Sequence, residues 1–328
     1  MPRPRVYVTR RIPRPGIDLL AKTCDVEVNP DDRPLSREEL LDNIAGRDGV
    51  LCLLTDRMDA RAFDACPGLK GLANYAVGYD NIDVAEATKR GVPISNTPDV
   101  LTDATAEMAW ALLFAAARRV VESDRVMRAG AWKGWGPLQF VGGDVGGAVL
   151  GIAGAGRIGT AMALKSRGFG MKVLYFDRVR SERLEKELGA RQVEFDDLLA
   201  ESDYISIHCP LNEQTRHLFG REQFAKMKTS AYLINTARGP IINEAELVEA
   251  LRSGAIAGAG LDVYEFEPET AGGLAALDNV VLAAHTGSAT RSSRTNMALK
   301  AASNLIAMLN GDQAPDCVNP DVYRGGRV

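Results

Sequence analysis

Three glycines with a fixed spacing constrain the fold of this 328-residue chain more than any other feature. Gly154, Gly156 and Gly159 form a G-x-G-x-x-G pattern between an apolar run at residues 148–153 and a helix-like stretch at residues 157–169. Glycine at the first position allows a tight turn, and glycine at the last position lets a helix pack closely on a strand. The pattern therefore predicts a strand, a sharp turn and a helix that covers a parallel sheet.

Short apolar runs alternate with helix-like segments along the rest of the chain. We expect strands at residues 6–9, 50–54, 69–74, 93–95, 148–153, 172–176, 204–208, 231–235, 257–263 and 280–284. We expect helices at residues 15–22, 105–129, 157–169, 181–188, 221–227, 244–252 and 289–310, and a loop rich in glycine and tryptophan at residues 130–147. Fully apolar strands that alternate with helices are typical of parallel sheets covered on both faces. The series restarts after the loop, which predicts two α/β units with hinges near residues 101–105 and 287–291.

Composition excludes several classes of function. A formal net charge of −4 provides no positive field for nucleic acid or an anionic membrane. The longest apolar run, residues 108–117, is far shorter than the roughly 20 residues that span a bilayer. The basic N-terminus carries no apolar core of signal-peptide length, and the five cysteines form no C-x-x-C pair, so we expect a reduced, cytoplasmic protein. Three scattered histidines predict no metal site.

The glycine pattern also predicts a site for a dinucleotide. Gly156 lets the backbone approach a pyrophosphate, and the first helical residues, Arg157 and Ile158, offer free N–H groups at the positive end of the helix dipole. Asp177 ends the next strand, where an acidic residue binds the ribose 2′-OH and repels a 2′-phosphate, which favours NAD over NADP. Arg178 and Arg180 weaken this preference, since either arginine could pair with a 2′-phosphate. The alternative is a glycine-rich turn without a ligand.

Three charged or titratable residues follow strands late in the chain. Arg238 follows residues 233–237, Glu267 lies in the sequence Asp-Val-Tyr-Glu-Phe-Glu-Pro, and His285 follows residues 280–284. Ligands bind outside the carboxyl ends of parallel strands, so we expect all three side chains to reach one crevice. A histidine can transfer a proton near neutral pH, a carboxylate beside it favours the imidazolium, and an arginine can bind a substrate carboxylate. Together they indicate hydride transfer to the C2 carbon of a small 2-oxo acid.

Each of these residues also has a structural interpretation. A histidine after a strand is more often a satisfied structural group, and Glu-Pro and Arg-Gly-Pro are usually turns. His208 and His217 are the rival histidines. We interpret His208 as a strand-end residue near the nicotinamide ribose, and His217 as a surface or capping residue.

The ordered motifs resemble those of the D-isomer-specific 2-hydroxyacid dehydrogenases over essentially the whole chain. The segments that carry the resemblance are residues 76–83, 96–107, 154–159, 208–211, 235–239, 261–264 with Glu267-Pro268, and 285–290. The resemblance implies an α/β protein with two Rossmann-like, doubly wound parallel-sheet domains. It implies that the NAD-binding domain, residues 104–289, is inserted into a discontinuous substrate domain, residues 1–103 and 290–328. It also implies a homodimer.

The resemblance also assigns roles to individual residues. It implies that Arg238 binds substrate, that Glu267 supports the histidine and that His285 is the acid/base. Val77, Gly78 and Ser288 are implied as further substrate-binding residues. The residues placed near the cofactor are Thr105, Gly154, Gly156, Arg157, Ile158, Gly159, Asp177, Pro210, Thr236, Ala237, Asp262 and Gly287.

Within the family, residues 51–57 and 97–103 resemble the glyoxylate/hydroxypyruvate reductases. Leu53 stands where phosphoglycerate dehydrogenases have a basic residue, which suits a small substrate without a phosphate. The segment after Glu267-Pro268 lacks the usual proline-rich continuation, and Ala284 replaces a proline that many relatives have before the histidine. Another 2-hydroxy acid as substrate, and a dinucleotide-sensing protein related to transcriptional corepressors, stay open as alternatives. Trp135 either narrows the active site of a partner subunit or packs in a dimer interface with Trp132.

Overall fold

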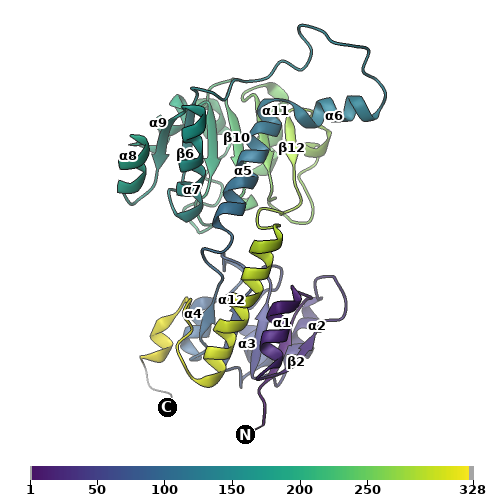
Figure 1. The fold of residues 1–328 in the computed structure, drawn as a ribbon, viewed down its shortest axis with the longest axis vertical. Helices are drawn as coiled ribbons and strands as arrows, with labels where there is room; N and C mark the ends of the chain where they lie inside the picture. The colour runs from purple at the N-terminus through teal and green to yellow at the C-terminus, as the bar shows by residue number, and fades with distance from the viewer. Residues whose placement is uncertain (1, 325–328) are drawn as a thin grey trace. The chain divides into compact units, whose positions relative to one another are not determined.

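The computed structural model describes residues 2–324 and divides them into two units of parallel sheet and helix (Figure 1). Unit 1 comprises Met1–Leu101 and Ala289–Val328, and unit 2 comprises Thr102–Ser288. Every strand pair in both sheets is parallel, as the runs of apolar residues predict. The expected fold class, two doubly wound α/β units with one inserted in the other, is therefore confirmed.

Unit 1 contains a five-stranded sheet of order β2-β1-β3-β4-β5. Its strands are β1 (Arg5–Val8), β2 (Asp25–Val28), β3 (Gly49–Cys52), β4 (Gly71–Asn74) and β5 (Ile94–Ser95). Every residue of β3 and β4 is buried, because helices cover both faces. The strand order reverses between β1 and β3, and in such sheets ligands bind beyond the carboxyl ends near the reversal.

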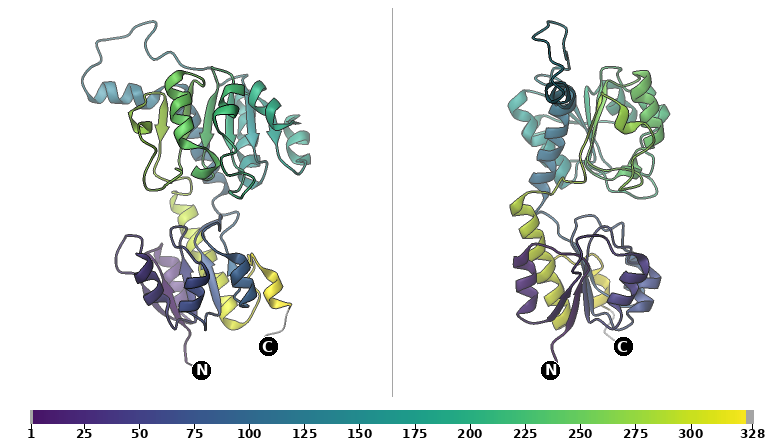
Figure 2. Two further views of the ribbon diagram at one scale, coloured as in Figure 1. Left: turned by 180° about the vertical axis from the view of Figure 1, so that it is seen from behind. Right: turned by 90° about the vertical axis from the view of Figure 1, so that its right-hand side faces the viewer.

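The helices of unit 1 form a layer on each face of this sheet (Figure 2). One layer contains α1 (Arg14–Ala21) and α12 (Arg291–Asn310), and the other contains α2 (Arg37–Ile44), α3 (Ala60–Ala65) and α4 (Val84–Lys89). A short 3-10 turn, η4, follows at Pro320–Tyr323. The first layer is closely packed, since a Cβ atom on Gly16 would lie 2.8 Å from the Cβ of Ala298.

Unit 2 contains a seven-stranded sheet of order β12-β11-β10-β9-β6-β7-β8. Its strands are β6 (Val149–Ala153), β7 (Lys172–Phe176), β8 (Arg191–Gln192), β9 (Tyr204–Ile207), β10 (Tyr232–Asn235), β11 (Gly258–Leu261) and β12 (Val280–Leu282). The chain runs outward from β6 through β7 to β8 and then returns to place β9 on the other side of β6. The carboxyl ends of β6 and β9 therefore flank the topological switch point of this sheet.

Helices on the two faces of this sheet enclose two hydrophobic cores. The core on one face is formed with α5 (Thr102–Ala117), α7 (Arg157–Lys165) and α8 (Glu182–Leu188). The core on the other face is formed with α9 (Phe195–Glu201), α10 (Arg221–Lys226) and α11 (Glu244–Ser253). The remaining elements are α6 (Val120–Arg128) and the 3-10 turns η1 (Ser166–Phe169), η2 (Gly239–Ile241) and η3 (Leu274–Ala276).

The single helix predicted over residues 105–129 is wrong. The chain forms two helices, α5 and α6, which are separated at Arg119, where φ is 51° and a right-handed helix cannot continue. The Arg119 guanidinium donates two hydrogen bonds of 2.8 Å to the Glu122 carboxylate, so a local side-chain pair accompanies the break. Nothing in the apolar spacing marks this change of direction, because both flanking segments are helical.

Several short elements escape prediction from the sequence. These are β2, α2, α3, α4, β8 and α9, none longer than eight residues. Such segments contain too few turns for a helical or alternating pattern to stand out, although caps mark them: the side chains of Ser36, Asp59 and Asp83 each accept a backbone N–H at a helix start. Within residues 2–324, none of the helices combines the length and the apolarity needed to cross a lipid bilayer.

Candidate active site

The three glycines surround the turn between β6 and α7 in unit 2. Gly154 has a φ of 100°, and a Cβ atom there would lie 2.4 Å from the backbone nitrogen of Cys209. A Cβ atom on Gly159 would lie 2.0 Å from the carbonyl oxygen of Gly154, so only glycine lets α7 pack this closely on the turn. Gly156, by contrast, faces open space within 4 Å of its missing Cβ atom. It lies directly before Arg157 and Ile158, the first residues of α7, and this exposed backbone fits a phosphate group.

Asp177 follows β7 and is tied to the glycine turn. Its Oδ2 atom accepts a 2.7 Å hydrogen bond from the Ala155 nitrogen, and its Oδ1 atom accepts one of 3.0 Å from the Val179 nitrogen. Arg180, one of the two nearby arginines, pairs instead with Glu185 through hydrogen bonds of 2.9 and 2.8 Å. The carboxylate therefore lies beside the glycine turn, whereas the Arg180 guanidinium is engaged elsewhere.

Arg238 lies in a loop that follows β10 and is shaped by Asn235. The buried Asn235 side chain donates to the Arg238 carbonyl over 2.9 Å and accepts from the Ala237 nitrogen over 3.0 Å. The Arg238 guanidinium donates to the Ala237 carbonyl over 2.8 Å. Thr236, between them, is buried, and its hydroxyl has no hydrogen-bond partner among the described residues. A buried hydroxyl without a partner fits a ligand that supplies one.

His285 and Glu267 form a direct pair, with 2.9 Å between the Nδ1 and Oε2 atoms. Partial burial would raise the pKa of Glu267, but the hydrogen bond from His285 and the charges of His285 and Arg238 hold that pKa below its ordinary value. A carboxylate at Oε2 makes Nδ1 the donor and leaves Nε2 free to exchange a proton with a bound molecule. Arg238, Glu267 and His285 follow three neighbouring strands, β10, β11 and β12, at the same edge of the sheet.

Asp262 holds the turn that carries His285. Its buried carboxylate accepts hydrogen bonds of 2.7 Å from the Thr286 nitrogen and 2.7 Å from the Gly287 nitrogen, and its carbonyl accepts one of 2.9 Å from the His285 nitrogen. A Cβ atom on Gly287 would lie 3.0 Å from the Asp262 Oδ2 atom and 3.4 Å from the side chain of Thr105. Asp262, Gly287 and Thr105 are therefore neighbours, and the half-buried Ser288 comes next in the chain.

The rival histidines occupy different environments. His208 follows β9, and its Nε2 atom lies 2.8 Å from the Ser206 hydroxyl. Burial lowers the pKa of His208 to about 3, so this imidazole is neutral near pH 7 and is a poor proton donor. Pro210, two residues later, is exposed, and its carbonyl accepts a 2.6 Å hydrogen bond from Thr215. His217 pairs with Glu265 over 2.6 Å and is 42% exposed.

Together these residues line one edge of the seven-stranded sheet. In strand order the carboxyl ends carry His285 after β12, Asp262 and Glu267 after β11, residues 236–238 after β10, His208 and Pro210 after β9, Gly154 after β6 and Asp177 after β7. The glycine turn lies beside the switch point, and the His285–Glu267 pair lies toward the β12 end. This order fits an extended dinucleotide with its reactive end near the histidine.

Val77 and Gly78 belong to a loop that follows β4 in unit 1. The Val77 carbonyl accepts a 2.7 Å hydrogen bond from the Asn96 side chain, and the Gly78 carbonyl accepts one of 2.9 Å from Asn74. Within residues 2–324 no acceptor pairs with the N–H group of either residue. Carbonyls held by side chains and unpaired N–H groups suit the binding of a carboxylate.

Sequence reasoning missed the asparagines that shape these loops. Asn74 and Asn235 each end a buried strand and are themselves fully buried. A polar residue that closes an otherwise apolar strand is the signal that could have identified them, because a buried amide needs backbone partners. Asn96 follows β5, and nothing in the sequence indicates its role except that it directly precedes Thr97 and Pro98.

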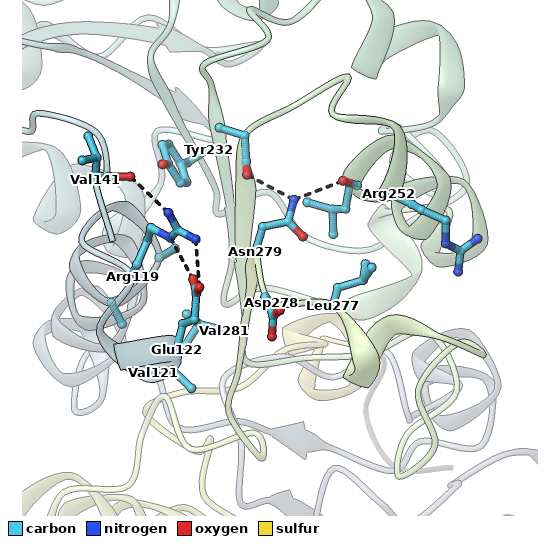
Figure 3. A pocket seen from close by; sticks show the side chains of 14 residues that line it. Arg119, Val121, Glu122, Val141, Tyr232, Arg252, Leu277, Asp278, Asn279 and Val281 are labelled. Carbon is cyan, nitrogen blue, oxygen red and sulfur yellow. Dashed lines mark hydrogen bonds and ion pairs between the residues drawn. The ribbon is translucent and has the colours of Figure 1, made fainter. Parts of the chain in front are cut away.

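A cavity of about 470 Å³ in unit 2 lies at the opposite edge of the sheet (Figure 3). It is lined by Tyr232, which opens β10, and by Ala257 and Asn279, which precede β11 and β12. The side chain of Asn279 donates to the carbonyls of Leu251 and Ala257 over 3.1 and 3.2 Å. Since the strands are parallel, this cavity is at their amino ends, and its lining does not include Arg238, Glu267 or His285.

The chain matches a family model and is similar to several relatives over nearly its whole length. Residues 110–287 match the model of the D-isomer specific 2-hydroxyacid dehydrogenase NAD binding domain. A glyoxylate reductase from Thermococcus onnurineus is 51% identical over 98% of this chain and 97% of its own length. All but a few residues of this chain thus align with one relative.

Solved structures are similar across both units. A glyoxylate reductase from Paecilomyes thermophila is 33% identical, with a TM-score of 0.87 over 98% of this chain and 100% of its own. The NADPH-dependent glyoxylate/hydroxypyruvate reductase from Sinorhizobium meliloti, in complex with NADP and malonate, is 29% identical, with a TM-score of 0.86 over 100% of each chain. More than half of the residues match the family model, and nearly the whole chain aligns with a relative that is about half identical. This chain therefore belongs to the family of D-isomer-specific 2-hydroxyacid dehydrogenases.

Proposed function

We propose that this protein reduces a small 2-oxo acid, such as glyoxylate or hydroxypyruvate, to the D-2-hydroxy acid with a reduced nicotinamide dinucleotide. The observation that carries the proposal is the His285–Glu267 pair, which shares one sheet edge with Arg238, on a neighbouring strand end, and with the glycine turn. The family model that matches unit 2 is that of an NAD-binding domain. Relatives about half identical to this chain are glyoxylate reductases, which supports the choice of substrate.

The protein's own groups supply binding and proton transfer in this reaction. When bound, the reduced nicotinamide supplies the hydride that reaches C2 of the acid. His285 donates the Nε2 proton to the oxygen at C2, and Glu267 orients the ring through Nδ1 and favours its protonated form. Arg238 binds the carboxylate of the substrate and polarises its keto oxygen. We assign carboxylate binding also to the N–H groups of Val77 and Gly78, and a supporting contact to Ser288.

We assign the cofactor to residues 104–289 and the substrate-binding backbone to residues 1–103 and 290–328. The cofactor ligands in this proposal are the glycine turn with Arg157 and Ile158, together with Thr105, Asp177, Pro210, Thr236, Ala237, Asp262 and Gly287. The unpaired hydroxyl of Thr236 and the open backbone at Gly156 support this assignment. All five cysteines are free thiols, which supports a reducing, cytoplasmic setting.

The test is turnover of a panel of 2-oxo acids by the purified protein and by two variants. We expect glyoxylate and hydroxypyruvate to be reduced, His285→Ala to lose about a thousandfold or more in kcat, and Arg238→Ala to lose activity mainly through kcat/KM. Wild-type rates in His285→Ala would overturn the proposed mechanism. A protein that binds dinucleotide yet reduces no acid would favour the dinucleotide-sensing alternative instead, and a preference for longer acids would change only the substrate.

We also propose that NADH is preferred over NADPH. The Asp177 carboxylate is held beside the glycine turn by two backbone N–H groups, where it can accept from a ribose hydroxyl and repel a phosphate. Arg180 is engaged by Glu185, although the exposed Arg178 stays available to an anion. We expect Asp177→Ala to lower the ratio of kcat/KM for NADH to that for NADPH by about tenfold or more. Faster turnover with NADPH in the wild-type protein would contradict the preference.

We infer that the protein is a homodimer held in part by residues 130–147. Trp135 and Leu138 in this segment are 83% and 88% exposed, and Val141 is 62% exposed. Several large, exposed apolar side chains on one short segment are typical of an interface between proteins. Whether Trp135 also narrows the partner's active site is tested by Trp135→Ala: a changed preference between glyoxylate and bulkier acids supports that role, and an unchanged preference supports simple interface packing.

A further inference from the structure

The segment that carries Glu267 has little apolar burial to hold it in place. Residues 266–270 are all exposed, including Phe266, which is 71% exposed. The Glu267 carboxylate must nevertheless stay within 2.9 Å of His285. Burial of apolar surface cannot supply this order, so polar contacts must do so. The Glu267 Oε1 atom accepts a 3.1 Å hydrogen bond from the Tyr264 nitrogen, and further contacts fix the backbone on either side of the segment.

Glu244, the first residue of α11, binds both ends of this segment. Its side chain is buried, its Oε2 atom accepts a 2.7 Å hydrogen bond from the Glu265 nitrogen, and its Oε1 atom accepts one of 2.6 Å from the Ala271 nitrogen. The two oxygens of one carboxylate therefore fasten positions 265 and 271, and Glu267 lies between them. Hydrogen bonds from backbone N–H groups to a carboxylate are among the stronger ones in proteins.

The Glu265 side chain bonds both to Glu244 and to His217. Its Oε2 atom accepts a 3.1 Å hydrogen bond from the Glu244 nitrogen, and its Oε1 atom lies 2.6 Å from the Nε2 atom of His217. The His217 nitrogen donates to the Pro240 carbonyl, just beyond Arg238 in the β10 loop. A Cβ atom on Gly239 would lie 1.9 Å from the carbonyl carbon of Tyr264, so this loop packs directly on the backbone just before Glu265.

We infer that Glu244, Glu265 and His217, here called the carboxylate clasp, are positioning residues that hold Glu267 against His285. The inference rests on the proposed function, since it concerns the same proton-transfer pair. None of the three touches the reacting atoms. The N-terminus of α11 and the imidazole of His217 offset the repulsion between the two neighbouring carboxylates.

A loosened clasp has a predictable effect on the pH dependence of reduction. Among the described residues, the Glu267 carboxylate pairs with the His285 ring, the Arg238 charge acts on Glu267, and the Asp262 carboxylate holds the backbone next to His285. When Glu267 moves away, the imidazolium loses a favourable charge and releases its proton at lower pH. Because reduction needs the protonated ring, activity is then lost at lower pH, whereas activity at acidic pH is kept. A general loss of stability does not shift the pH at which activity is lost on the alkaline side of the profile.

Glu244→Gln tests the clasp with little change in shape, since the amide keeps one acceptor and turns an NH₂ group toward a backbone N–H. The kcat/KM for glyoxylate is measured from acidic to alkaline pH in the wild type, in this variant and in Glu249→Gln. Glu249 lies on the same helix, is exposed and pairs only with Arg221 among the described residues, so it is the matched control. We expect Glu244→Gln to lose activity about half a pH unit lower, about threefold in kcat/KM at alkaline pH. Glu249→Gln should match the wild type.

The second measurement needs no turnover. The chain has three histidines, and His208, with a pKa of about 3, does not titrate near neutral pH. NMR can follow the other two imidazoles, and His217→Asn removes one of them, which assigns the remaining signal to His285. Asparagine tolerates the φ of 53° at this position, so this variant should fold even if Glu244→Gln does not.

We expect the titration midpoint of His285 to fall in Glu244→Gln and in His217→Asn, toward the value in Glu267→Gln. A His285 midpoint that stays at its wild-type value in both clasp variants would overturn the inference. If the wild-type protein reduced no acid at all, the proposed function would fail while this titration still decided whether the clasp orders the pair.

Discussion

Single polar residues in this protein shape the backbone of the site more often than they reach toward a ligand. Asn235 holds the Arg238 loop, and Asp262 holds the His285 turn. Asn96 and Asn74 hold the carbonyls of Val77 and Gly78. All of these supports lie at or just beyond the ends of strands, where the loop backbone loses its ladder partners and needs side chains instead.

Asn235 offers a direct test of this role. Asn235→Ala removes an acceptor from the Ala237 nitrogen and a donor to the Arg238 carbonyl, which costs about 1–3 kcal/mol in the free energy of unfolding. We also expect kcat/KM to fall about tenfold or more, because the Arg238 loop shifts. Asn279→Ala is the control, since Asn279 also bonds two backbone groups but at the opposite edge of the same sheet. Equal losses of activity in both variants would contradict the positional argument.

His208 predicts how stability depends on pH. Its pKa is lowered from 6.5 to about 3 in the folded protein because burial disfavours the charged ring. Between these values the unfolded chain binds a proton that the folded protein does not, so the free energy of unfolding falls as pH decreases through this window. His208→Gln removes this contribution, and thermal unfolding should show a smaller drop in Tm from neutral pH to about pH 4 than in the wild type. An equal drop would mean that His208 is protonated in the folded state.

At the scale of elements, function depends on how closely β6, α7 and β9 approach one another. Gly154 and Gly159 permit contacts between backbones that no side chain could accommodate. The strand order places this close approach at the switch point of the sheet, which is where sheets of this kind bind ligands. Helix α7 can therefore direct its N-terminus at a phosphate only because its first turn carries glycine.

Gly159→Ala should separate α7 from the turn. The new Cβ atom would lie 2.0 Å from the Gly154 carbonyl oxygen, which forces a shift of the helix or the turn and weakens dinucleotide binding by about tenfold or more. Fluorescence titration with NADH measures the affinity. Gly168→Ala, in the 3-10 turn that follows the same helix, is the control because nothing lies within 4 Å of its added Cβ atom. Unchanged affinity in Gly159→Ala would show that the glycine turn does not bind the phosphates.

At the scale of the whole molecule, residues 130–147 expose apolar surface that the rest of residues 2–324 leaves uncovered. Leu138→Lys places a charge on the most exposed of these side chains, and we expect it to shift the proposed dimer toward monomer, with at least a tenfold weaker association. Sedimentation velocity at several concentrations measures the effect. Val179→Lys is the control, since Val179 is similarly exposed, at 72%, but lies elsewhere in unit 2. A dimer as tight as the wild type in Leu138→Lys would exclude this segment from the interface.

The local sequence determined the fold class and selected the groups that we propose to react. Apolar strands separated by helices require a parallel sheet, and the glycine spacing requires a close strand–helix turn, so both follow from residues near one another in the chain. Arg238, Glu267 and His285 could be selected because each follows a strand and carries the required chemistry. Short elements such as β2 and α4, and the break at Arg119, left no comparable pattern.

Only the tertiary structure decided what supports those groups. Glu244 looks like an ordinary first-turn acid of a helix, and Glu265 and His217 look like surface residues. Their contacts join segments around positions 217, 244 and 265, and these pairings follow from the order of strands and the packing of loops. A hydrogen bond depends on distance in space, and no periodicity along the chain encodes which distant backbone group a buried carboxylate will meet.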